Sequence, residues 1–177
     1  MPRLAVVALL LIGACACDAP WEGPTLPEGA HWIAVRAIAS GPENCWISDA
    51  LIAGPSVDQV EARVQAACAA RGCNKTVGCW PGVIQPADGI FVAIYRNNAG
   101  CATTGKGGWA ASPTALYAVY WEGRSGPSCG EAGMASAFVL YAVARSVLPN
   151  VRLLRVELQL QRPQYPTYTQ DTEVDLG

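Results

Sequence analysis

SVDQVEARVQAACAAR, the sequence of residues 56–71, has the spacing of an amphipathic helix. Its valines recur three or four positions apart, which places them on one face of a helix. Ser56 is a suitable N-cap, Gln59 completes a capping box, and Gly72 is a typical stop signal. We therefore predict a helix over this stretch, with its apolar face packed on the core of the domain.

Stretches on both sides of this helix have the patterns of strands. Residues 31–40 (HWIAVRAIAS) contain β-branched side chains and end at a Gly-Pro pair. Residues 90–95 (IFVAIY) are a short apolar run typical of a buried strand, and we expect residues 101–111 to return as its hairpin partner. Residues 151–161 (VRLLRVELQLQ) alternate apolar and polar side chains, with a break at two adjacent leucines that a bulge would explain.

Two later stretches have the start signals of helices. A Ser-Pro pair precedes residues 114–122, which places the proline where a first helical turn tolerates it. A capping box opens residues 129–148, which are apolar on nearly all sides until a proline ends the run. Together these patterns predict an α+β fold, in which a small antiparallel sheet packs against two or three helices.

The N-terminus has the layout of an export signal. MPRLAVVALLLIGACAC contains a basic residue, then an apolar run, then small residues and cysteine. The run from Leu4 to Ile12 is too short to cross a bilayer, which takes about 20 apolar residues. Residues 12–15 (IGAC) fit a lipobox, which predicts a lipid on Cys15. The alternative is Cys17, because modification there leaves an even number of cysteines downstream.

These signals divide the chain into one domain with flanking segments. Proline and glycine are frequent between residues 18 and 29, as in an extended spacer. We expect a lipoprotein-type signal peptide over residues 1–14, a lipidated N-terminus and Pro/Gly linker over 15–30, a single α+β domain over 31–162, and a mobile tail over 163–177.

Six cysteines follow the N-terminal pair. In an exported protein, an even set indicates a disulfide framework, and six cysteines allow about fifteen pairings between which spacing does not choose. The alternative is a zinc cluster on three of them, but no histidine lies nearby. We therefore expect a disulfide-stapled domain with no metal site and no cofactor. The disulfide candidates are Cys45, Cys68, Cys73, Cys79, Cys101 and Cys129.

The charge balance argues against a nucleic-acid partner, because the formal net charge is −2, the isoelectric point is about 5.3 and the basic residues are scattered. The leading interpretation is an exported cell-envelope lipoprotein, periplasmic or on the outer face, with a non-catalytic binding or structural domain. Plain secretion is the alternative localisation. The expected partners are the membrane, through the N-terminal lipid, and a protein of the envelope. Trp80, in a loop, is the candidate contact residue.

One segment favours an enzymatic alternative. Residues 43–46 (ENCW) lead into an apolar run, and this arrangement resembles the nucleophile segment of papain-like cysteine hydrolases. Such enzymes need a histidine base, and His31 is the single histidine of the chain. The alternative function is therefore a cysteine hydrolase that uses Cys45 and His31.

The order of motifs also resembles a family. WIAVRAIASG, DALIAGPS, QVEARVQAACAARGC, FVAIYRNNAGCA and GGWAASPTALYAV follow one another within residues 31–123. This order is similar to that of domain of unknown function 4189, small exported bacterial proteins. The resemblance implies an exported α+β domain without established catalysis, with Cys68, Cys73 and Cys101 as the family cysteines. Residues 74–89 depart from the pattern as an insertion that carries Cys79, and residues from 130 onward lie outside it.

Overall fold

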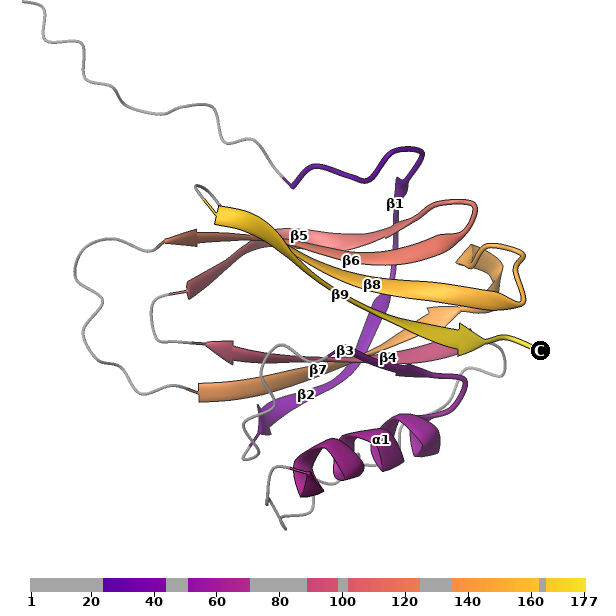
Figure 1. Cartoon of the computed structure of the whole chain (residues 1–177), viewed down its shortest axis with the longest axis horizontal. Helices are drawn as coiled ribbons and strands as arrows, with labels where there is room; N and C mark the ends of the chain where they lie inside the picture. The colour runs from indigo at the N-terminus through magenta and orange to yellow at the C-terminus, as the bar shows by residue number, and fades with distance from the viewer. Residues whose placement is uncertain (1–23, 44–50, 71–88, 99–101, 125–134, 163–164) are drawn as a thin grey trace, which may run out of the picture.

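The computed structural model of the chain describes residues 24–43, 51–70, 89–98, 102–124, 135–162 and 165–177. Within these ranges the chain forms nine strands, one α-helix and one short 3₁₀ helix (Figure 1). The strands are β1 (His31–Ile33), β2 (Arg36–Glu43), β3 (Leu51–Gly54), β4 (Gly89–Asn98), β5 (Ala102–Ala111), β6 (Ala115–Arg124), β7 (Ala135–Ala144), β8 (Leu153–Arg162) and β9 (Tyr165–Asp175). The helices are α1 (Val57–Ala69) and η1 (Arg145–Val147).

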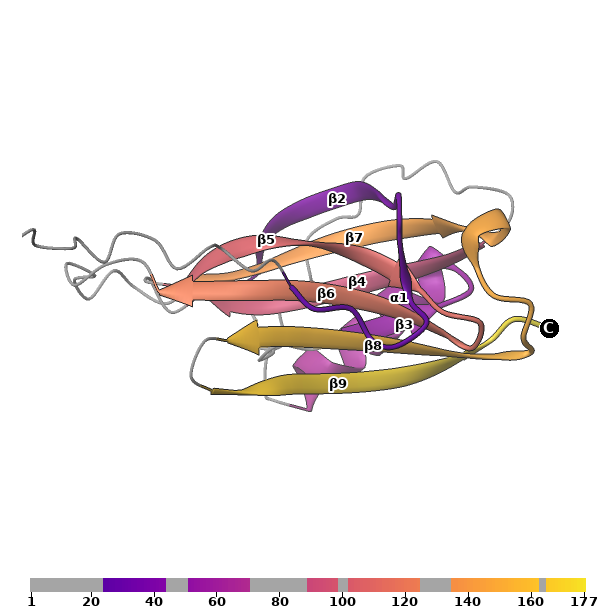
Figure 2. The ribbon, with the colours of Figure 1, turned by 90° about the horizontal axis from the view of Figure 1, so that it is seen from above.

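The strands form two sheets that pack face to face. Sheet A has the order β1-β5-β6-β8-β9, and sheet B has the order β2-β7-β4-β3. Neighbouring strands are antiparallel except β6 and β8, which are parallel. Strands of both sheets run along the long axis of the molecule (Figure 2). Buried residues of both sheets share one core cluster, so the architecture is a β-sandwich.

Sheet B is buried on both of its faces. In β4, the even-numbered residues from Ile90 to Ile94 belong to the core between the sheets. The odd-numbered residues from Phe91 to Tyr95 belong to a second cluster, which they share with α1. All six residues are at most 2% exposed. A strand covered on both sides needs apolar residues at every position, which accounts for the continuous run IFVAIY.

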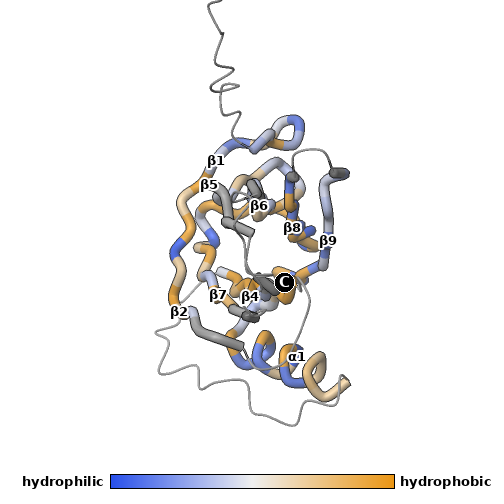
Figure 3. Tube along the Cα trace, turned by 90° about the vertical axis from the view of Figure 1, so that its left-hand side faces the viewer, coloured by the Kyte–Doolittle hydropathy of each residue, from blue (hydrophilic) through white to orange (hydrophobic). Residues whose placement is uncertain are grey.

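α1 covers the outer face of sheet B (Figure 3) and confirms the predicted helix. The N-cap forms as expected, because the backbone N–H of Gln59 donates to Ser56 Oγ at 3.3 Å. The residues that α1 buries against the sheet are Val57, Val60, Val64 and Cys68. Burying side chains of this size contributes about 1.5 to 3 kcal/mol each.

The chain crosses between the sheets at one edge of the sandwich. The stretch 31–40, predicted as one strand, supplies β1 to sheet A and the start of β2 to sheet B. At the opposite edge, β3 lies beside β9, and the backbone N–H of Leu51 donates to Gln170 Oε1 at 3.2 Å. A side chain thus satisfies a backbone group of an edge strand that has no further strand to pair with.

The predicted fold class is wrong, because the described chain is mostly β, with two sheets and a single α-helix. Residues 115–124 form β6 instead of a helix, and residues 135–144, which lie within the apolar stretch predicted as a helix over 129–148, form β7. Both faces of β7 contribute to the core, Val143 between the sheets and Phe138 and Leu140 in the cluster beneath α1. An apolar run covered on all sides cannot be assigned to helix or strand by periodicity, and the capping signals misled the prediction.

Three smaller expectations are also wrong. β5 is a strand, but it pairs with β1 and β6 in sheet A and forms no hairpin with β4. The segment 163–177, expected to be a mobile tail, contributes β9 to sheet A. The bulge expected at the two leucines is absent, because β8 and β9 stay in register from Leu153 to Leu160. Leu153 is simply an outward-facing residue that is 55% exposed, so the phase does not break at the two leucines. The register of β8 and β9 shifts only further along, between Leu160 and Arg162.

The disulfide framework expected as part of the fold is not present in the described ranges. Of the six candidates only Cys68 lies there, 1% exposed on the sheet-facing side of α1. The other five candidates lie outside the described residues: Cys45, Cys73, Cys79, Cys101 and Cys129.

Candidate functional site

The residues singled out by sequence fall mostly outside the described ranges. Both lipidation candidates, Cys15 and Cys17, lie there, as do the nucleophile candidate Cys45 and the contact candidate Trp80. His31 is described, and it is an exposed residue at the start of β1, paired in register with Ala111 of β5.

The described residues contain no candidate metal cluster and no candidate membrane-spanning helix. No group of three or more His, Cys, Asp or Glu side chains among them is placed to hold a metal ion. None of the helices in the described ranges has the length and apolar character needed to span a membrane.

The outer face of sheet A carries a row of side chains that changes character across the sheet. Strand register aligns five residues in this row, which we call the cross-strand row: Trp32, Ala110, Tyr117, Glu157 and Asp171. The row starts at β1 with an indole ring, continues through alanine and phenol, and ends at β8 and β9 with two carboxylates. Residues directly opposite each other on neighbouring strands have Cβ atoms about 5 Å apart, so the row is a continuous strip.

The acidic end of the row is held in a hydrogen-bonded network. Glu157 accepts from Gln159 Nε2 at 2.7 Å and pairs with Arg155 Nη2 at 2.8 Å. Arg155 also donates from Nε to Asp171 Oδ2 at 3.0 Å. The Glu157 side chain is only 8% exposed although it points away from the sandwich core. The network therefore presents carboxylate, guanidinium and amide groups in fixed positions.

The aromatic end of the row is open to solvent. Trp32 is 50% exposed. Its ring lies over Gly108 of β5, where an added Cβ would approach the ring to within 3.2 Å. The ring thus packs on the β5 backbone at Gly108, beside its register partner Ala110, and leaves half of the side chain exposed.

The N-terminal segment is fastened to the same face. Thr25 donates its backbone N–H to Gln161 Oε1 at 2.7 Å, and its carbonyl oxygen accepts from Gln161 Nε2 at 2.6 Å. Leu26 and Pro27 are half-buried. Residues 24–30 then run above sheet A to β1, as Figure 1 shows. This part of the predicted linker is consequently docked on the domain.

An aromatic cluster lies inside the sandwich. The ring of Trp109 meets that of Tyr141 edge to face, with centroids 4.9 Å apart, and the hydroxyls of Tyr141 and Tyr120 are 2.9 Å apart. Trp109 Nε1 is buried and has no hydrogen-bond partner in the described part of the chain. These rings belong to the core between the sheets, where they join β5 and β6 to β7. We assign them to packing.

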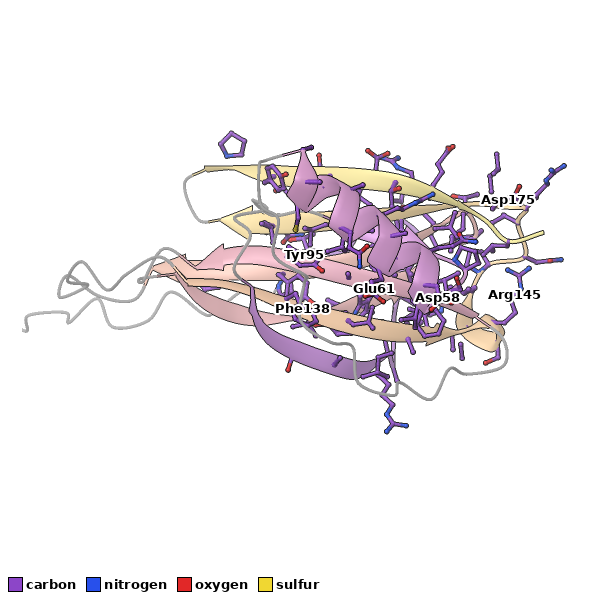
Figure 4. All side chains as sticks on the ribbon, turned by 90° about the horizontal axis from the view of Figure 1, so that it is seen from below. Asp58, Glu61, Tyr95, Phe138, Arg145 and Asp175 are labelled. Atoms are coloured by element: carbon purple, nitrogen blue, oxygen red, sulfur yellow. The ribbon has the colours of Figure 1, made fainter. Side chains whose placement is uncertain are left out.

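A second aromatic pair lies beneath α1. The rings of Tyr95 and Phe138 stack with centroids 5.8 Å apart and an interplanar angle of 28°. Both residues are buried, and Figure 4 labels them in a view from the α1 side. The figure also labels Arg145, whose buried Nη1 finds no partner among the described residues. This side of sheet B presents a packed core, with no exposed aromatic side chain among the residues described.

Sequence reasoning missed most of the cross-strand row for a simple reason. Tyr117 and Trp121 fall in a stretch that was predicted as a helix, so their common side of a strand was not apparent. The polar face of residues 155–161 was recognised, but it was not expected to hold a carboxylate that is almost fully buried. The usable signal was composition, because residues 115–121 (ALYAVYW) include three aromatic side chains and one β-branched side chain, which are enriched in strands.

Comparison of the chain with protein-family models, with curated proteins and with solved structures finds no match in any of the three.

Proposed function

We propose that the protein is an exported, lipid-anchored protein of the cell envelope, and that its β-sandwich is a non-catalytic domain that uses the outer face of sheet A as its contact surface. Residues 12–15 (IGAC), after an apolar run, support the anchor at Cys15, with Cys17 as the alternative. The cross-strand row supports the contact surface.

One observation carries the assignment of this face. Glu157 is nearly buried, and Gln159, Arg155 and Asp171 are fixed around it by contacts of 2.7 to 3.0 Å. Because Arg155 and Asp171 are each more than half exposed, water screens these pairs, and each stabilises the fold by about 1 kcal/mol at most. Groups already held in place lose little entropy on binding, which favours recognition.

The anchor is tested by mass spectrometry of the N-terminal peptide from the full chain produced in bacteria and exported. We expect a peptide that begins at Cys15 and carries the mass of attached acyl chains. The Cys15→Ala variant should lose that mass and leave the membrane fraction, whereas Cys17→Ala should keep both. Lipid found on Cys17 would assign the anchor to the alternative cysteine. An unmodified, soluble chain would overturn the proposal.

The contact surface is tested with a photo-reactive amino acid at single positions of the full chain in intact cells. Position 117 lies within the cross-strand row, and position 65 lies on the exposed side of α1, at the opposite face of the domain. We expect adducts from position 117 and none from position 65. Adducts from position 65 alone would assign contact to the wrong face and overturn the assignment.

A further inference from the structure

The tether between the lipid and the docked segment is short. Nine residues, 16–24, separate Cys15 from Thr25, where hydrogen bonds first fasten the chain to sheet A. Ten residue steps reach at most about 36 Å when fully extended.

This length decides which side of the domain can face the bilayer. The tether joins the domain on the outer face of sheet A, at Gln161. Packed sheets lie about 10 Å apart, and α1 adds a further layer beyond sheet B. To turn α1 toward the membrane, the tether would have to travel around the sandwich near full extension. The limited reach of the tether instead favours an orientation with the outer face of sheet A toward the lipid surface.

We propose that the β1 side of this face, centred on Trp32, inserts into the headgroup region of the bilayer that holds the anchor. This inference rests on the proposed function, since without a lipid the tether fixes nothing. It goes further in naming the occupant, a phospholipid surface, and the residue that contacts it.

The chemistry of Trp32 suits that occupant. An indole ring combines a large apolar surface with one N–H donor, and tryptophan is enriched where hydrocarbon meets headgroups. Trp32 is 50% exposed at an edge strand, and Gly108 and Ala110 beside it do not shield it. Tryptophan is highly buried on average, so a ring with half of its surface exposed offers a large apolar area for contact.

Charge selects the β1 side over the β8–β9 side of the same face. The charged side chains on β8 and β9 that point outward or lie at the strand ends include Arg155, Asp171, Glu173 and Asp175. Burying such groups among lipids is costly, and an anionic surface repels the carboxylates. Among the described residues, the segment 24–33 at the aromatic end of the cross-strand row carries a single carboxylate, Glu28, so this end meets both penalties to a smaller extent.

Quenching of tryptophan emission by brominated lipids tests the proposal. The full lipidated chain is reconstituted in vesicles of phosphatidylethanolamine and phosphatidylglycerol, with or without bromine on the acyl chains near the headgroups. The Trp32→Phe variant is the reference, because all its other tryptophans are unchanged. We expect brominated lipids to quench a larger fraction of the emission of the native chain than of the Trp32→Phe variant. The difference between the two quenched fractions measures the contact of residue 32 with the lipids.

A matched control uses the exposed leucine of the charged side. Leu153 is 55% exposed on the same face of sheet A, as the first residue of β8. In the Trp32→Phe background, Leu153→Trp should show little added quenching. Added quenching at position 153 equal to that at 32 would place the whole face on the bilayer and overturn the selection of the β1 side.

Two further results would overturn the inference. If the chain carries lipid by mass spectrometry but Trp32 is not quenched, the membrane contact is wrong while the anchor stands. If Trp32 becomes shielded from a water-soluble quencher as the concentration of detergent-solubilised protein rises, the occupant is a second copy. Mass spectrometry of the same sample is done first, to establish whether the chain carries lipid. Absence of the lipid would contradict the proposed function itself, and not only the membrane contact.

Discussion

Sheet B and sheet A differ in how many faces they bury. Sheet B lies between sheet A and α1, and residues 90–95 of its strand β4 form the continuous apolar run IFVAIY. Sheet A packs on sheet B with one face and carries the docked segment 24–30 on the other, and its strand β8 alternates, with Val156, Leu158 and Leu160 inward and charged or amide side chains outward. Sheet B therefore contributes mainly to the stability of the fold, whereas the outer face of sheet A has exposed side chains that are available for contacts. Substitutions in sheet B should lower the free energy of unfolding more than substitutions on the outer face of sheet A.

The largest expected effect is on sheet B. Phe91 is 2% exposed beneath α1, so Phe91→Ala leaves a cavity and should lower the free energy of unfolding by about 3 to 5 kcal/mol. Urea unfolding measures it. Leu153→Ala on the outer face of sheet A should change the same quantity by no more than about 0.5 kcal/mol. Equal losses at both positions would erase the distinction between the sheets.

A smaller effect is expected on α1. Val64 is fully buried against sheet B, and Val64→Ala removes two methyl groups, which should cost about 1 to 2 kcal/mol after the better helix propensity of alanine is included. Gln65→Ala, on the exposed side, should be nearly neutral. Helical ellipticity and tryptophan emission should change together during unfolding. A separate helical transition would mean that α1 is not part of the same cooperative unit as sheet B.

On the outer face of sheet A, Glu157→Gln should cost only about 1 kcal/mol. The amide keeps the shape of the side chain but loses the charge that pairs with the half-exposed Arg155. Added salt should reduce the difference in unfolding free energy between the native protein and Glu157→Gln, because salt screens the ion pair that only the native protein has. Glu173→Gln, an exposed neighbour on β9, is the control and should be neutral. A loss above about 3 kcal/mol would show that this face is a second core.

The smallest global effect is expected at Gln161. Gln161→Ala removes both hydrogen bonds to Thr25, which are exposed, so the unfolding free energy should fall by less than about 1 kcal/mol. The local effect should be clear, with faster amide exchange at Thr25 and faster proteolysis between residues 24 and 30. Gln159→Ala leaves these two bonds in place and should leave the segment protected. An unchanged exchange rate in Gln161→Ala would show that Leu26 and Pro27 hold the segment without Gln161.

The same difference between the sheets explains which elements could be predicted. β8 was identified because alternation marks a strand with one buried face, and α1 because its valines and its cap agree. β6 and β7 were mistaken for helices, since alanine-rich apolar stretches satisfy both periods and cap-like residues precede each one. Local signals decided these predictions, and tertiary contacts decided the structure.

The candidate site was harder to predict from the sequence than the fold. Its members come from β1, β5, β6, β8 and β9, so the cross-strand row exists only once the register of five strands is known. Trp32 was visible in the sequence, but its exposure was not, because most tryptophans pack in cores. Gln161 was placed on the polar side of its strand, and nothing nearby in sequence indicates that it binds Thr25, 136 positions away.

That separation has a consequence for the order in which the chain can fold. The parallel pair of β6 and β8 is joined through β7 of the other sheet, and β9, almost the last residues, completes sheet A. A polypeptide emerging N-terminus first must therefore release nearly its whole length before its leading segment has anything to dock on. Such a topology delays assembly, because contacts between distant residues form slowly. Under the proposed export, such slow assembly favours a translocation route that handles unfolded chains.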